Sequence, residues 1–333
     1  MRASVDVPPP DSSTALDLPR AIFTNARMKR LFPVIALAAF AVLPALHAAT
    51  FPDELKVGGF AVGCQAYTFN RFSVFEAIEK TASTGAKVIE FFPGQKLSPA
   101  EPEVRFGHEV VREITGPDGK KQTEKLDAAA TKTAWDKVKA KLKEAGITPV
   151  AYGVVGLSKN EADSRKVFEF AKSFGIRVIN TESVDAIDTF EKLVKEYDIM
   201  VGFHDHPKRA DDPNYRMWDP NYILSVVKDR DARIGACADI GHWVRSGLKP
   251  IDCVKILKGR IVSSHMKDLH APLPSGHDVH WGQGVSGVKE VLDEYKAQGF
   301  EGPISVEYEY NWDNNVEDAK ACIAFVRAYG EKK

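Results

Sequence analysis

Short apolar runs rich in β-branched and aromatic residues recur along the chain from Val57 onward. Runs of this kind, bounded by polar and glycine-containing stretches, predict buried strands. Eight of them can be counted, at residues 62–69, 87–92, 148–155, 177–181, 199–204, 233–239, 260–265 and 304–308. Because amphipathic helical patterns separate these runs, we expect repeated βα units around a parallel sheet.

The intervening segments carry apolar residues at spacings of three and four, for example at Trp135, Val138 and Leu142, which predicts helices. Several predicted helices end in a glycine just before the next strand, namely at Gly85, Gly146, Gly175 and Gly299. Eight βα units favour a closed barrel, which typically takes about 250 residues. The rival doubly wound sheet requires a glycine fingerprint after its first strand, and residues 65–71 contain no glycine. We therefore predict a single-domain α/β fold, a (β/α)8 TIM barrel, over residues 49–333.

Residues 93–127 interrupt the alternation directly after the second predicted strand. The sequence Gly-Pro-Asp-Gly at 116–119 is typical of a turn, and it lies between residues 110–115 and 122–126, so a hairpin is expected. Loops that follow barrel strands lie at the C-terminal face. The insertion is therefore either a partial lid over the barrel mouth or a surface elaboration.

The first 48 residues lie outside the barrel pattern. Met28, Lys29 and Arg30 precede an apolar run at 31–46, which ends in His-Ala-Ala. This order predicts a signal peptide at 28–48 and export, with a periplasmic location. The alternative is a membrane anchor, but the run contains two prolines and is shorter than the ~20 residues that span a bilayer. Residues 1–27 show no periodicity and are interpreted as an upstream extension that is not native.

Composition narrows the class of partner. With 45 Lys+Arg against 46 Asp+Glu, the chain has no basic excess, which argues against nucleic acid as a partner. The four cysteines have no CxxC spacing and lie among apolar residues. They are expected to be buried free thiols, although an exported protein could form disulfides. After signal cleavage no membrane contact is expected, and a homo-oligomer remains open.

Ionisable residues gather at the ends of strands four to eight, where barrel enzymes build their active sites. They are Glu182, His204, His206, Asp239, His242, His265, Lys267 and Glu307. Within this set, His204, Asp239, His265 and Glu307 are predicted to bind one divalent metal ion. Two imidazoles and two carboxylates suit Mn²⁺, Co²⁺, Zn²⁺ or Fe²⁺ better than Ca²⁺. The alternative is a hydrogen-bonded polar layer without metal.

Further residues are candidates for catalysis and substrate binding. Glu182, His206 and Glu307 are candidate proton-transfer groups. Lys267 could neutralise charge on the substrate, or could form a surface ion pair with Asp268. Tyr67, Trp243 and Trp281 could form an apolar face for a sugar ring, or could pack between loops. Gln283 lies in a glycine loop whose backbone could approach a ligand.

Three segments give the sequence a family resemblance. Ala-Asp-Ile-Gly-His at 238–242, Ser-His-Met-Lys-Asp at 264–268 and Ser-Val-Glu-Tyr-Glu at 305–309 resemble the xylose isomerase-like barrel superfamily of sugar phosphate isomerases and epimerases, over residues 62–329. The resemblance implies metal-binding roles for Asp239, His265 and Glu307, and contact of His242 with substrate hydroxyls. His204 departs from the family, which commonly has a glutamate there that in the epimerases also moves a proton.

The sequence therefore predicts a metal-dependent isomerase or epimerase that acts on an unphosphorylated keto-sugar through a metal-stabilised enediolate. Export favours a free sugar over a phosphorylated one, and the His-rich set of the endonuclease branch is missing. The alternative is a lyase or hydratase that eliminates a β-oxygen from 3-keto-glycosides or keto-inositols, which the departure at His204 favours. A third hypothesis is a sugar-binding barrel without activity.

The N-terminal interpretation predicts where the exported protein begins. Expressed with its own leader and purified from the periplasm, the protein should start near Ala49, because signal peptidase cleaves after small residues. N-terminal sequencing measures this directly. A mature start before Met28 would contradict both the signal peptide and the upstream extension.

Overall fold

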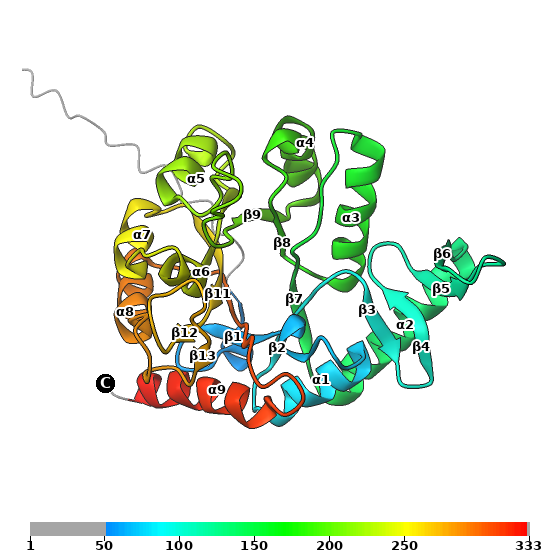
Figure 1. The fold of residues 1–333 in the computed structure, drawn as a ribbon, viewed down its shortest axis with the longest axis horizontal. Coiled ribbons are helices and arrows are strands. Elements are labelled where there is room, and N and C mark those ends of the chain that lie inside the picture. Colours follow the sequence, from blue (N-terminus) through cyan, green and yellow to red (C-terminus); the bar gives the residue numbers. More distant parts are fainter. Residues whose placement is uncertain (1–50, 332–333) are drawn as a thin grey trace, which may run out of the picture. The chain divides into compact units, whose positions relative to one another are not determined.

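The computed structural model describes residues 51–331. Within them, eight parallel strands form a closed barrel in the order β1-β14-β11-β10-β9-β8-β7-β2 (Figure 1). The strands are β1 (Ala61–Gln65), β2 (Val88–Phe91), β7 (Thr148–Tyr152), β8 (Val178–Thr181), β9 (Met200–His204), β10 (Ile234–Asp239), β11 (Ile261–Met266) and β14 (Pro303–Val306). Each predicted apolar run corresponds to one of these strands, so the predicted TIM barrel is confirmed.

Helices surround the strands, with α9 beside α1 where the ring closes (Figure 1). The helices are α1 (Val74–Ser83), α2 (Ala128–Ala145), α3 (Glu161–Phe174), α4 (Ile187–Tyr197), α5 (Pro220–Val227), α6 (Ile240–Arg245), α7 (Pro250–Ile256), α8 (Val288–Gln298) and α9 (Val316–Glu331). Short 3-10 turns lie at Asp53–Leu55, Ala66–Phe69 and Val184–Ala186.

Local signals set the helix ends. Helix α2 begins after Asp127, whose side chain accepts the Ala130 N–H, and it ends at Gly146 with φ 65°. Helices α3 and α8 likewise end at Gly175 and Gly299, in the left-handed conformation that a side chain disfavours. The glycines predicted as helix ends therefore terminate these helices in the structure.

The apolar faces of the helices pack on the barrel wall. In α2 the side chains of Val138 and Leu142 are buried, while Trp135 is partly buried, as their spacing predicted. The four cysteines, all within the described range, are buried and free, which confirms the prediction of buried thiols. Burial raises the pKa of the Cys64 thiol to about 12, so it stays protonated at neutral pH.

The insertion after β2 is a four-stranded antiparallel sheet in the order β3-β4-β5-β6, formed by Gln95–Ser98, Glu101–Phe106, Val111–Thr115 and Lys121–Lys125. The predicted hairpin is β5–β6, and its register runs from Val111 opposite Lys125 to Thr115 opposite Lys121. The other two strands were not predicted, because β3 has a single large apolar residue, Leu97, and β4 has only two, Val104 and Phe106. Figure 1 shows β4, β5 and β6 at the side of the barrel, next to α2.

The predicted signal peptide at 28–48 and the extension at 1–27 lie outside the described residues. Over the range that the structure does describe, none of the helices has the length and apolar character needed to cross a membrane.

Candidate active site

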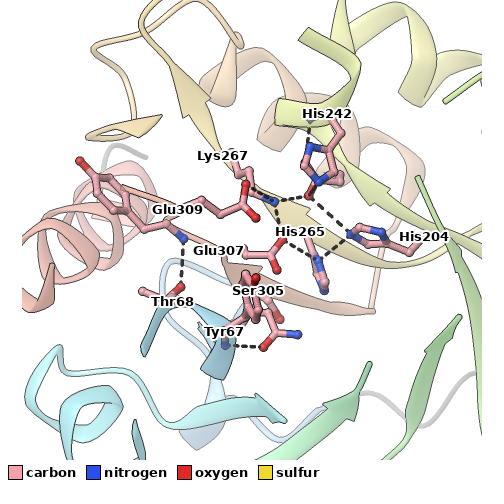
Figure 2. Close-up of polar contacts among 12 residues, drawn as sticks. Tyr67, Thr68, His204, His242, His265, Lys267, Ser305, Glu307 and Glu309 are labelled. Carbon is pink, nitrogen blue, oxygen red and sulfur yellow. Dashed lines mark hydrogen bonds and ion pairs between the residues drawn. The ribbon is translucent and has the colours of Figure 1, made fainter. Parts of the chain in front are cut away.

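Four side chains from adjacent strands converge at the C-terminal end of the barrel (Figure 2). His204 ends β9, Asp239 ends β10, His265 lies in β11 and Glu307 follows β14. All four are buried, and one possible ligand atom of each lies within 4.8 Å of the others. The structure therefore brings together the four predicted metal ligands.

The donor atoms fit a single divalent ion. His204 Nε2 lies 3.0 Å from His265 Nδ1 and 3.5 Å from Asp239 Oδ2, and His265 Nδ1 lies 3.1 Å from Glu307 Oε2. Adjacent atoms that each bind one ion at about 2.1 Å are separated by roughly 3.0–3.4 Å. His204 Nδ1 is also buried and has no hydrogen-bond partner. The donor set and its spacing match a borderline ion such as Mn²⁺ or Zn²⁺.

Glu90, at the end of β2, orients one of these ligands. Its Oε2 accepts hydrogen bonds from His265 Nε2 at 2.9 Å and from Ser305 Oγ at 2.6 Å, and its Oε1 accepts from Asn180 Nδ2 at 2.7 Å. With Nε2 of His265 donating to Glu90, Nδ1 is the nitrogen that faces the centre, and it would offer a lone pair to an ion once its own proton is lost. The sequence-based prediction did not include Glu90, although a lone carboxylate within an apolar run was a signal for it.

Asp239 is fixed by backbone groups on both sides. Its own N–H donates to Asp205 Oδ1 at 2.8 Å, and its Oδ1 accepts the His242 N–H at 2.9 Å as the N-cap of α6. Its other oxygen, Oδ2, faces the centre. Asp239 is therefore both a candidate metal ligand and the residue that caps α6. The capping hydrogen bond holds its carboxylate in one orientation.

Lys267 lies in the middle of the carboxylates. Its Nζ contacts Asp239 Oδ2 and Glu307 Oε2 and lies 3.8 Å from Glu309 Oε2. Burial disfavours the ammonium, but the three carboxylates outweigh it and hold the pKa of Lys267 well above its usual value. The alternative of a surface ion pair with Asp268 is wrong, because both side chains are buried.

A cavity of about 260 Å³ opens beside the four ligands. It is lined by Gln65, Tyr67, Phe92, Pro93, Gly153, Val154, His204, His206, His242, Glu307 and Glu309. The Tyr67 ring packs edge-on against Phe92 at 5.2 Å and Trp312 at 5.8 Å, which gives the cavity an aromatic wall. The rings of His206 and His242 are stacked, with centroids 5.0 Å apart. Tyr67, His206, His242 and Glu307 thus lie where the sequence placed them.

Glu182 lies behind His206. The two side chains contact each other through Glu182 Oε1 and His206 Nδ1, and the Tyr215 hydroxyl donates to the same oxygen at 3.3 Å. Burial would raise the pKa of Glu182, but the bond to His206 outweighs it and lowers the pKa. Glu182 is therefore a carboxylate that supports His206, and it does not line the cavity itself.

The family follows from the comparisons with known proteins. The sequence model of the xylose isomerase-like TIM barrel matches residues 78–329. The chain belongs to this family. This membership confirms the resemblance carried by the ends of β10, β11 and β14. No curated protein matches the sequence.

Solved structures share the family's barrel. An uncharacterised protein from Parabacteroides distasonis ATCC 8503 is 28% identical, with 81% of this chain and 98% of that chain covered and a TM-score of 0.57. A D-tagatose 3-epimerase-like protein is 18% identical over 81% and 97% of the two chains, with a TM-score of 0.58. A family member from Mycobacterium smegmatis in complex with magnesium is 13% identical over 81% and 96%, with a TM-score of 0.56.

Three residues that were predicted to contact substrate do not line the cavity. Trp243 and Trp281 are 1% and 3% exposed and belong to the hydrophobic core, so their rings pack between elements. Gln283 is exposed on its loop and does not line the cavity. Large aromatic residues next to strand ends are as useful for burial as for binding, and sequence proximity to a strand end did not distinguish the two uses.

The glycines of the loop at 281–285 were expected to let backbone approach a ligand, but the structure uses N–H groups of this segment in internal hydrogen bonds. Gly282 and Gly284 donate to Asp268 Oδ2 at 2.8 and 3.0 Å, and Ser286 donates to Asp268 Oδ1 at 2.9 Å. A Cβ on Gly284 would lie 2.3 Å from the Asp268 carboxylate. The glycine is therefore needed to wrap the loop around a buried aspartate of the same chain.

The sheet at 95–125 supports the surface-elaboration alternative. None of its residues is among those that line the cavity, and β6 is exposed along its whole length. Only Phe92 and Pro93, which precede the sheet, reach the cavity wall. The insertion buries Leu97, Val104 and Phe106 against the barrel's helical layer, so its role in the structure is packing.

The contact of Glu90 with His265 predicts a weaker metal site in Glu90→Gln. The glutamine side chain has one oxygen that can accept hydrogen bonds, whereas both oxygens of Glu90 accept them. The orientation of His265 is then less well fixed, and metal affinity should fall about 10- to 100-fold. Titration calorimetry with Mn²⁺ measures the change. Glu113→Gln, in an ion pair of the exposed hairpin, is the control and should bind as the parent does. Equal affinity in Glu90→Gln would contradict this role.

Proposed function

We propose that the protein is a metal-dependent enzyme that removes a proton next to the carbonyl of a keto-sugar and acts as an isomerase or epimerase. One observation carries the proposal. Four side chains that could hold one ion converge beside one cavity, and His204 and Glu307 of this set line it together with His206, which Glu182 contacts from behind. The neighbours named as sugar epimerases, which include D-allulose 3-epimerase from Methylomonas sp. and L-ribulose 3-epimerase, share the barrel and are consistent with this class.

A divalent ion held by His204, Asp239, His265 and Glu307 would act as a Lewis acid on adjacent sugar oxygens, which acidifies the neighbouring C–H. The remaining chemistry belongs to the chain's own side chains. Glu307 borders the cavity and can accept a proton through the carboxylate oxygen that its other contacts leave free. Buried Lys267 offsets the negative charge of the carboxylates, so that an anionic reaction state is not repelled.

His206 is the second proton-transfer group in this proposal. Its ring is about two-fifths exposed on the cavity wall, and its Nδ1 contacts Glu182, which leaves Nε2 available to substrate. An isomerase needs a group that returns the proton to the adjacent carbon, and an epimerase needs one on the opposite face. His206 and Glu307 are separate groups on one cavity, and together they can meet either need.

A lyase is the second candidate, and His204 favours it. A ligating imidazole has no spare carboxylate oxygen, so the proton-transfer group that the family commonly has on this strand is absent here. β-Elimination requires one base and a group that protonates the departing oxygen. His206 could do the latter, and the cavity wall of Tyr67 and Phe92, with Trp312 packed against Tyr67, could accommodate a second ring.

The cavity, at about 260 Å³, is small enough for a single sugar unit to fill most of it, and polar groups are among its lining residues. Those groups include His242, which is 4% exposed and whose pKa burial lowers well below its usual value, so the imidazole is neutral at pH 7. A neutral ring can donate one hydrogen bond to a sugar hydroxyl. We propose an unphosphorylated substrate, which agrees with the export that the sequence predicts.

Substrate-dependent hydrogen exchange tests the proposed function. Metal-loaded protein incubated with keto-sugars and 3-keto-glycosides in D₂O should introduce deuterium next to the carbonyl of at least one free keto-sugar, read by NMR. Deuterium incorporation without cleavage supports the isomerase or epimerase, whereas release of the aglycone supports the lyase. Absence of both across the set, with metal bound, would refute carbonyl-directed proton transfer.

The pair formed by Glu182 and His206 predicts a loss of turnover without loss of metal. In His206→Gln and Glu182→Gln the rate should fall about 10²- to 10⁴-fold, because a general base or its supporting carboxylate is removed. Metal content by mass spectrometry should not change, since neither residue belongs to the four ligands. His280→Gln is a matched control, because His280 is equally exposed and also pairs with a carboxylate, Asp318 at 2.8 Å. Loss of metal in either variant would instead make Glu182 and His206 ligands.

A further inference from the structure

Two stacked imidazoles on the cavity wall contact different kinds of neighbour, one a hydrogen-bond acceptor and the other a hydrogen-bond donor. His206 and His242 both line the cavity, with ring planes 29° apart. Each uses Nδ1 for a contact with another side chain and leaves Nε2 for the cavity side or the metal centre. The partner of Nδ1 determines which nitrogen carries the proton in a neutral histidine.

At His206 the partner is an acceptor. The lowered pKa of Glu182 keeps this carboxylate ionised, and an ionised carboxylate only accepts hydrogen bonds. His206 Nδ1 must therefore carry a hydrogen and donate it to Glu182. In the neutral ring, Nε2 is then a lone pair, which can take a proton from a bound molecule.

At His242 the partner is a donor. Arg245 Nη1 lies 3.2 Å from His242 Nδ1, and a guanidinium is always protonated and has no acceptor atom. His242 Nδ1 must therefore be the lone pair that accepts this bond. The ring proton then sits on Nε2, which lies 3.6 Å from Asp239 Oδ2 at the edge of the metal centre. The two rings are thus oppositely polarised.

Arg245 is held so that it cannot turn away. Its Nη1 also donates to Glu309 Oε2 at 2.6 Å, its Nε donates to the Gly276 carbonyl at 3.0 Å, and its Nη2 lies 3.5 Å from Asp278 Oδ2. Its side chain is 12% exposed. Burial raises the pKa of Asp278 to about 8, so Glu309 is the carboxylate that balances the guanidinium at neutral pH.

We propose that Arg245 is a positioning residue that fixes His242 as the Nε2–H tautomer, a neutral hydrogen-bond donor to a substrate oxygen, while Glu182 fixes its stacked neighbour His206 with the opposite polarity, as a proton acceptor through Nε2. The two tautomers follow from the hydrogen-bond contacts alone, whereas the assignment of the acceptor to a substrate oxygen rests on the proposed function.

The arrangement divides the work between the two rings. His206 Nε2 accepts a proton from the substrate carbon, and the resulting imidazolium keeps its Nδ1–H bond to Glu182. Because this ring is about two-fifths exposed, the proton on Nε2 can exchange with solvent before Nε2 returns a proton to the substrate. His242 keeps its proton throughout and contributes only a hydrogen bond. A second proton on His242 would have to sit on Nδ1, directly against the guanidinium of Arg245, so this ring is excluded from proton transfer.

The tautomers can be measured by NMR of protein with ¹⁵N-labelled histidine, both without metal and with Zn²⁺. Spectra of His206→Asn and His242→Asn assign the two rings. In the parent, His242 should be protonated at Nε2 and His206 at Nδ1. In Arg245→Met, His242 should lose its single tautomer, because Nδ1 no longer faces a donor, while His206 should be unchanged. Arg230→Met is the control, since Arg230 forms comparable ion pairs with Asp188 and Glu191 away from the cavity.

Arg245→Met removes the nearer of the two cations beside Glu309, so Arg245→Met/Glu309→Gln serves as a second variant that removes one charge of each sign, with folding checked by circular dichroism. If a keto-sugar substrate is in hand, kcat of both variants should fall about 10²-fold with little change in KM and metal content, as for loss of one positioned donor. Protonation of His242 at Nδ1 in the parent, or an unchanged tautomer in both variants, would overturn the proposal. Absence of activity in the parent would refute the proposed function and would leave the tautomer result intact.

Discussion

Two buried carboxylates at the barrel mouth need a cation beside them, and this need determines how the surrounding side chains of the candidate site are arranged. Asp239 and Glu307 are almost fully buried within contact of one ammonium, Lys267. An unpaired buried carboxylate is strongly unfavourable, and removal of one partner of a buried pair typically costs about 3–5 kcal/mol. The carboxylates can therefore remain ionised because a cation lies among them. A bound divalent ion would meet the same electrostatic need with greater charge.

Helix α6 extends this constraint along the cavity wall. Asp239 is its N-cap, His242 lies three residues later, and Arg245 is three residues beyond that. Residues at a spacing of three share one helix face, so a single short helix carries a ligand candidate, a hydrogen-bond donor and the arginine that fixes the donor. The neighbouring His206 lies just after β9. It is supported by Glu182, which follows β8, and by Tyr215 from the β9–α5 connection.

The His204 position separates this chain from the family pattern and shapes the choice between reactions. An imidazole there retains a ligand atom but gives up a carboxylate oxygen for proton transfer. The pair of Glu182 and His206 lies close by, with the rings of His204 and His206 4.6 Å apart. In the proposed mechanism His206 is a proton-transfer group that lies beside the four candidate ligands and not among them, so its replacement is expected to leave metal binding intact.

The sequence by itself determined the barrel and the four convergent ligand candidates, because both depend on short-range patterns. A buried strand needs an apolar run, and a polar residue at its end must lie at the barrel mouth. The apolar runs within residues 62–308 therefore predicted eight strands. The strand ends in turn pointed to the four ligand candidates, His204, Asp239, His265 and Glu307. Glycines after helices marked left-handed caps for the same local reason.

Only the tertiary structure decided which nearby residues face the cavity and what each contacts. Trp281 and Gln283 lie close to strand ends in sequence, yet one is in the core and the other in solvent. Glu90 and Arg245 carry no motif, and their roles arise from contacts with His265, 175 residues away, and with Glu309, 64 residues away. Glu90 and His265 lie on different strands, so closure of the barrel brings these two partners into contact, whereas the contact of Arg245 with His242 lies within helix α6.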